Sequence, residues 1–158
     1  AISAASIAVS RLGVRFDGLL DMHVKPGVAP SLQTALLDQL AGWILPAVLF
    51  WAYARLFSRH VRLLDFIGMA GLARLPILLC ALVTLPLMPA DPSELVKPTP
   101  ALLAIAGAGV VFFVLNVTLL YKGFKNASGL TGAKLVAGFI GLVIVAEALS
   151  KLVLVLLT

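Results

Sequence analysis

Four long apolar stretches constrain this chain more than any other feature of its sequence. They cover about residues 40–57, 66–88, 101–121 and 134–157, and few of their side chains are charged. A helix of about 20 mainly apolar residues is long enough to cross the hydrocarbon core of a bilayer. Hydrophobic residues make up 61% of the chain and charged residues 12%, against about half and a quarter in a soluble domain. The sequence therefore predicts an all-α, polytopic transmembrane helix bundle whose main partner is the lipid bilayer.

A fifth apolar run, at about residues 1–9, is too short to cross a membrane. It is a cleaved signal, a stub lying at the membrane surface, or the tail of a span whose beginning is missing. A signal peptide has a basic start and a small-residue cleavage site, and this run has no basic start. We therefore expect an incomplete first span, which gives about five spans. No linker of low complexity divides residues 1–158, so we expect a single transmembrane domain.

Basic residues gather in two of the segments between spans, and this asymmetry predicts the orientation of the chain. One side has six basic residues against the single acidic Asp65, and the other side has four basic against five acidic residues. Because basic loops stay in the cytoplasm, the six-residue side should be cytoplasmic, the N-terminus inside and the C-terminus outside. The six form two basic turns: Arg55, Arg59 and Arg62, and then Lys122, Lys125 and Lys134.

The net charge of +5 would suggest nucleic-acid binding in a soluble protein. In a membrane protein the same excess is the ordinary positive-inside pattern. The chain has no basic stripe with interleaved stacking aromatics, so we expect no nucleic-acid partner. Anionic lipid head groups are the partner that suits the two basic turns.

Arg74 is a charged side chain inside the third apolar stretch. Such a residue costs roughly 2.5–3.5 kcal/mol at the centre of a membrane helix. It either faces the bundle interior beside a partner, or extends its head group to the nearby interface. Pro76 lacks a backbone N–H, which frees the carbonyl of Leu72 and predicts a kink beside this cation.

Glu147 and Lys151 place two further charges in the last stretch. Their spacing and order favour an ion pair within the helix. If Lys151 extends to the outer face instead, Glu147 needs another partner, and Arg74 is the other strongly buried charge. We therefore treat Arg74, Glu147 and Lys151 as candidates for ligand binding or ion pairing, and weigh a direct contact between Arg74 and Glu147.

The remaining polar residues give weaker indications. Asp17, Asp21 and His23 have side chains that bind divalent metals, but no second cluster completes a site, and a solvated loop is the preferred interpretation. We expect no metal, no cofactor and, since no catalytic motif is present, no enzyme. Small residues predict that the fourth and fifth spans touch; they are Ala104, Gly107, Ala108 and Gly109 in one span, and Ala133, Ala137, Gly138 and Gly141 in the other.

Two segments resemble the Yip domain family, the Ypt/Rab-interacting membrane proteins and their bacterial relatives. The first combines the basic turn RLFSRHVRLLDFIG, residues 55–68, with ARLP at residues 73–76. The second is LYKGFKNASGLTGAK, residues 120–134, which leads through glycines into the last span. The resemblance extends over about residues 40–157. It implies five spans, a cytoplasmic N-terminus and an outward C-terminus.

The resemblance also bears on function. Eukaryotic members are linked to vesicle trafficking and bind small GTPases, but this chain lacks their long cytoplasmic N-terminal region, so a bacterial inner-membrane relative is the expectation. The leading hypothesis is a non-enzymatic scaffold or adaptor in trafficking or membrane organisation, with a protein partner or a second copy of itself. The alternative is a small transporter or channel subunit that uses Arg74 and Glu147 as a polar site.

Overall fold

The computed structural model describes residues 2–10, 13–15, 18–20, 23–24, 30–87 and 99–157. Four of its helices are long and apolar enough to span a membrane: Leu32–Phe57, Leu63–Leu87, Pro100–Ser128 and Gly132–Leu156. The short N-terminal helix α1 (Ile2–Ser10) comes before them. The predicted all-α membrane bundle with four complete spans is confirmed.

Local breaks divide the first two long helices. The first consists of α2 (Leu32–Gln39), a π-helical turn η1 (Leu40–Ile44) and α3 (Leu45–Phe57). The second consists of α4 (Leu63–Ala73), α5 (Leu75–Thr84) and the 3₁₀ turn η2 (Leu85–Leu87). The other two spans are the unbroken helices α6 (Pro100–Ser128) and α7 (Gly132–Leu157).

The helix ends follow local capping chemistry and correct two predicted boundaries. Ser31 caps α2 by accepting a hydrogen bond from the backbone N–H of Thr34 at 3.1 Å, so the first long span begins at Leu32 and not near residue 40. Helix α6 continues to Ser128 and ends at Gly129, whose φ of 66° needs a residue without a Cβ. Lys122 and Lys125 therefore lie on the last turns of α6 and not in a loop.

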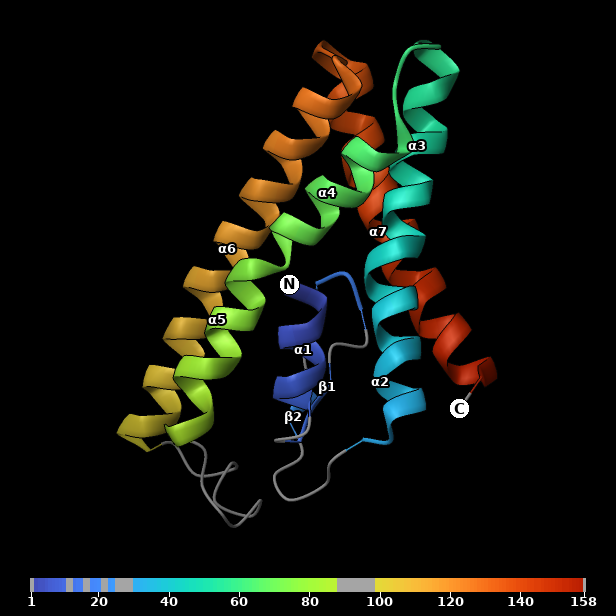
Figure 1. The fold of residues 1–158 in the computed structure, drawn as a ribbon. Helices are drawn as coiled ribbons and strands as arrows, with labels where there is room; N and C mark the ends of the chain where they lie inside the picture. The colour runs from blue at the N-terminus through green and yellow to red at the C-terminus, as the bar shows by residue number, and fades with distance from the viewer. Residues whose placement is uncertain are drawn as a thin grey trace.

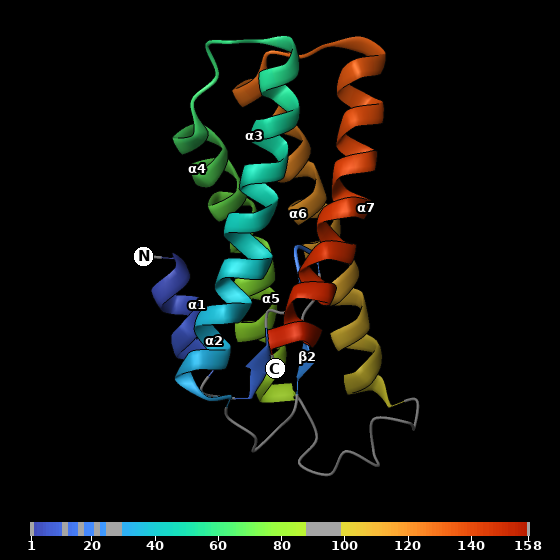
Figure 2. The same ribbon diagram turned by 90° about the vertical axis from the view of Figure 1, so that its right-hand side faces the viewer.

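The helices form two groups that converge at one end. Helices α4, α5 and α6 lie on one side of the molecule, and α2, α3 and α7 lie on the other (Figure 1). The two groups meet where the short connections 58–62 and 129–131 lie, and they separate toward the opposite end. A view from the side shows all four long helices running lengthwise through the molecule (Figure 2).

The N-terminal segment lies between the two groups of helices. Helix α1 contacts α5, α2 and α4. A short antiparallel pair follows it, β1 (Val14–Arg15) and β2 (His23–Val24), with Val14 opposite Val24. Both views place α1 and this pair in the half of the molecule where the two groups separate (Figures 1 and 2).

Aromatic side chains form the core at the converging end. Phe124 of α6 packs with Phe50 of α3, Phe66 of α4 and Phe139 of α7, at ring-centroid distances of 4.9, 6.4 and 6.3 Å. The rings of Phe50, Phe66 and Phe124 are fully buried. This cluster joins one helix from each of the four spans.

The fourth and fifth spans touch as predicted, but not through their small residues. Helices α6 and α7 diverge from their shared turn (Figure 1). Gly138 instead packs against the ring of Tyr53 on α3. A Cβ added at Gly107, Gly109 or Gly141 would meet nothing within 4 Å. The two spans touch through the Phe139 ring, which packs against Tyr121 and Phe124 near the shared turn. Small side chains permit a close approach without specifying which helix approaches.

Candidate functional site

Arg74 lies at the break between α4 and α5, in the interior of the bundle. Its backbone (φ −75°, ψ −12°) interrupts the helix two residues before Pro76, as the missing proline N–H predicts. Its side chain is only 4% exposed. Of the two alternatives that we considered, the side chain takes the interior position and does not extend to the interface.

Asp38 is an acidic residue whose charge acts on Arg74. It lies on α2, is 2% exposed, and its carboxylate stabilises the guanidinium electrostatically. Asp38 is one of the five acidic residues counted on the outer side, because the polar segment before residue 40 was predicted to be a loop. The structure corrects this assignment: the polar face of α2 is buried against the rest of the bundle, where Asp38 and Gln39 face inward.

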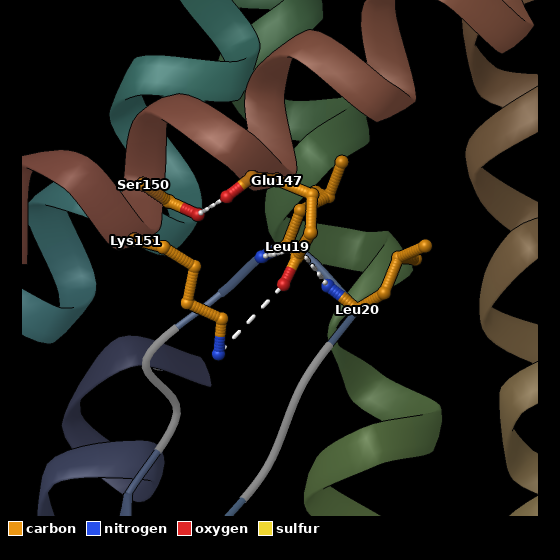
Figure 3. A network of polar contacts seen from close by, with 5 residues as sticks. All are labelled: Leu19, Leu20, Glu147, Ser150 and Lys151. Carbon is orange, nitrogen blue, oxygen red and sulfur yellow. Dashed lines mark hydrogen bonds and ion pairs between the residues drawn. The ribbon is translucent and has the colours of Figure 1, made fainter.

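Glu147 holds the tip of the N-terminal hairpin. Its Oε2 accepts hydrogen bonds from the backbone N–H groups of Leu19 and Leu20, at 3.0 and 3.2 Å. Its Oε1 lies 3.8 Å from Nζ of Lys151, one turn farther along α7. Figure 3 shows the carboxylate pointing away from α7 to these two backbone amides, with the Lys151 side chain on its other side. The ion pair that the i,i+4 spacing favours is therefore formed.

Two glycines allow the hairpin tip to approach both charged residues. A Cβ added to Gly18 would lie 2.5 Å from Oε1 of Glu147. A Cβ added to Gly42, in η1, would lie 2.6 Å from Nη1 of Arg74 and 2.6 Å from the carbonyl oxygen of Gly18. The backbone at Gly18 therefore lies between the two charges.

The direct contact between Arg74 and Glu147 that we weighed is not formed. Within the described part of the chain, Glu147 pairs with Lys151 and with the hairpin backbone, while Arg74 interacts with Asp38. Sequence distance and depth along the helices suggested the contact, but neither could show that another segment would come between the two side chains.

Two buried side chains that the sequence analysis did not single out connect helices near the same break. Asn116 of α6 donates a hydrogen bond from Nδ2 to the carbonyl oxygen of Ala73, at 2.6 Å. Trp43 of η1 donates from Nε1 to the carbonyl oxygen of Ile67, at 2.8 Å, and its indole packs against Gly71. An asparagine in the middle of an otherwise apolar span was the available signal for the first contact.

We expect Asn116→Leu to lower the free energy of unfolding by about 1–2 kcal/mol, since the Ala73 carbonyl at the helix break loses its donor. Equilibrium unfolding by SDS in mixed micelles measures this. The matched control is Asn126→Leu, at an exposed position on the same helix. Equal losses in the two variants would contradict the structural role assigned to Asn116.

A shallow groove lies beside Glu147 on the outside of the bundle. It encloses about 420 Å³ and is lined by Leu20, Val143, Ile144, Glu147, Ala148 and Lys151. Its walls are mostly apolar, and its charged lining residues are Glu147 and Lys151. Leu20 of the hairpin tip forms part of its wall, and Arg74 is not among its lining residues.

The weak metal candidates are not tested by the structure. Asp17 and Asp21 lie outside the described residues, and only the backbone of His23 is placed. Among the described residues no group of three His, Cys, Asp or Glu side chains could hold a metal ion.

The six basic residues of the predicted turns are all exposed at the converging end. The guanidinium of Arg55 lies over the Trp51 ring at 5.8 Å, and the ammonium of Lys134 lies over the Phe57 ring at 5.0 Å. Within the described residues the other four make no ion pair or side-chain hydrogen bond, and we call them the free basic residues: Arg59, Arg62, Lys122 and Lys125.

The comparisons with known proteins gave one match. The family model of the Yip1 domain matches residues 2–155, which is nearly the whole chain. Neither the curated proteins nor the solved structures that were compared gave a match.

Proposed function

This chain belongs to the Yip1 domain family and is an integral, multi-pass membrane protein, and on that premise we propose that it works as a non-enzymatic scaffold or adaptor. In this proposal the bundle is a rigid platform, and the free basic residues at its converging end recruit a partner. We place that end in the cytoplasm of a bacterial cell, with the protein in the inner membrane, because basic segments between spans stay inside.

The observation that carries this proposal is that polar side chains within the spans bond to other segments of the same chain. Glu147, Asn116 and Trp43 each bond to backbone atoms of another segment of the same chain. Arg74 is buried and has Asp38 to offset its charge. Groups that hold a bundle together in this way are expected in a scaffold, whereas a transporter needs polar groups that face a water-filled path.

The converging end supplies the surface that a partner would contact. The four free basic residues are exposed, and Asp65 is the acidic residue in the same segments of the sequence. In this proposal they form a positive surface at the level of the lipid head groups. Each basic residue near an anionic membrane surface contributes about 1 kcal/mol of attraction. We therefore propose anionic lipid head groups as one partner, and a protein or a second copy of this chain bound at the same end as the other.

A charge-neutral variant tests this proposal. The change is Arg59→Gln, Arg62→Gln, Lys122→Gln and Lys125→Gln together, and the control is Lys151→Gln, which removes one cation elsewhere in the molecule. Both proteins are cross-linked in native membranes and purified, and bound protein and co-purifying anionic lipid are measured. We expect the fourfold variant to retain less than about a tenth of the bound protein and of the anionic lipid, because it loses about 4 kcal/mol of attraction. Lys151→Gln should retain both.

Two results would contradict the scaffold role. One is the absence of any stable partner, protein or lipid, from the unmodified chain. The other is solute or ion flux in proteoliposomes that Arg74→Gln abolishes, since flux of this kind would favour the transporter alternative.

A further inference from the structure

The chain around Gly18–Leu20 is irregular backbone inside a membrane-spanning bundle. Helix α7 runs from Gly132 to Leu157, so Glu147 lies near its middle, and the hairpin tip that it contacts lies at the same level. Non-helical backbone at such a depth is tolerated only where the protein itself satisfies its polar groups. Something in the bundle must therefore hold the tip in place.

Glu147 provides that hold through a single carboxylate oxygen. Two successive N–H groups, of Leu19 and Leu20, donate to Oε2. Hydrogen bonds to a charged acceptor are stronger than those between neutral groups. The Leu19 side chain beside them is almost fully buried, so the polar attachment is accompanied by apolar packing.

The fit around the tip is steric as well as electrostatic. A Cβ at Gly18 would fit only if the Glu147 carboxylate shifted, and a Cβ at Gly42 would collide with the Gly18 carbonyl and the Arg74 guanidinium. Leu20 at the same time forms one wall of the groove that Glu147 and Lys151 line. The tip therefore separates this groove from the side on which Arg74 lies.

We infer that the segment at Gly18–Leu20 is a re-entrant plug, and that Glu147 is the latch that keeps it seated between the groove and Arg74. When the latch is lost, the plug leaves its seat and the buried polar interior at Arg74 opens to the groove. Lys151 contacts the other carboxylate oxygen and orients the latch. This inference does not depend on the scaffold role.

A buried thiol on the plug reports whether it is seated. The parent protein for the test carries Cys80→Ala, which removes the natural thiol, and Leu19→Cys, which places a thiol in the buried position of the tip. A membrane-impermeant maleimide is added to proteoliposomes, and the rate of labelling is measured. In the parent we expect slow labelling.

Two variants break the latch by different routes. Glu147→Ala removes the acceptor, and Gly18→Ala keeps the carboxylate but places a methyl group against it. We expect each to raise the labelling rate about tenfold or more. Glu147→Ala deletes the hydrogen bonds to the charged carboxylate, and the methyl group of Gly18→Ala pushes that carboxylate away from the two N–H groups. Two controls match them: Lys151→Gln removes a partly exposed ion pair and should change the rate less than about fivefold, and Gly68→Ala adds a methyl group in open space and should leave the rate unchanged.

A disulfide between the plug and α7 gives a second measurement. Leu20 and Ile144 line the same groove, so Leu20→Cys and Ile144→Cys in the Cys80→Ala background should cross-link under mild oxidation, and Glu147→Ala should abolish the cross-link. Circular dichroism checks that each variant keeps its helices. The inference is wrong if the parent labels as fast as Glu147→Ala, or if Gly18→Ala, with its helices intact, labels as slowly as the parent.

Discussion

Asp38→Asn is expected to lower the free energy of unfolding by about 3–5 kcal/mol, a large effect for replacing one carboxylate oxygen with an amide nitrogen. Asp38 and Arg74 are both almost fully buried, and the carboxylate stabilises the guanidinium. Removing a carboxylate that stabilises a buried guanidinium is costly, because charges interact strongly in a medium of low dielectric constant. Unfolding by SDS in mixed micelles, followed by circular dichroism, measures the difference.

The double variant Asp38→Asn with Arg74→Gln separates the charge from other effects. Because neither charge then remains, the double variant should be more stable than Asp38→Asn alone. Asp65→Asn is the matched control, since it makes the same chemical change at an exposed position of the first turn of α4 and should have a small effect. If Asp38→Asn and Asp65→Asn lose equal stability, the charge of Asp38 has no structural role in the bundle.

The same pair shows how far sequence reasoning reached. The cost of a charge within a span predicted that Arg74 either has a partner or reaches the interface, and the structure shows it buried. The partner was missed because residues 32–39 contain Gln33, Asp38 and Gln39, and their polarity resembles that of a loop. The acidic residue became visible only when tertiary packing turned that polar face inward.

The hairpin at Glu147 could not have been predicted from periodicity or charge. Both describe side chains, whereas Glu147 binds the backbone N–H groups of Leu19 and Leu20, which any residue except proline carries. The available signal was the pair Gly18 and Gly42, since glycine permits the close approach of a neighbouring backbone. Glycine is common in membrane helices for other reasons, so the pair alone does not identify the contact.

The spans themselves were predictable because their length is fixed by the bilayer and not by the fold. The contacts between the spans were less predictable. Proline at residue 76 determined the break at Arg74 through a missing N–H, which is a local effect. The neighbours of Gly138 and Gly107 depend on the directions of whole helices, and the two spans touch through Phe139 and not through these glycines.

Phe124→Ala is the second change for which we expect a large loss, about 3–5 kcal/mol in the free energy of unfolding. Phe124 is fully buried, and its ring packs with Phe50, Phe66 and Phe139 from the three other spans. Between helices in lipid the hydrophobic effect contributes little, so stability depends on close packing. Truncating this ring removes contacts to three helices at once and leaves a cavity that the rigid helices cannot fill.

Phe113→Ala on the same helix is a matched control, because it deletes the same atoms three turns away. The Phe113 side chain is 47% exposed and faces outward, where lipid tails fill the vacated volume. We therefore expect Phe113→Ala to leave the unfolding midpoint in mixed micelles almost unchanged, while Phe124→Ala shifts it strongly. Similar shifts in both variants would mean that α6 does not join the four spans through Phe124. If Phe124→Ala alone unfolds the converging end, it should also weaken partner binding by the free basic residues, because their spacing depends on this aromatic cluster.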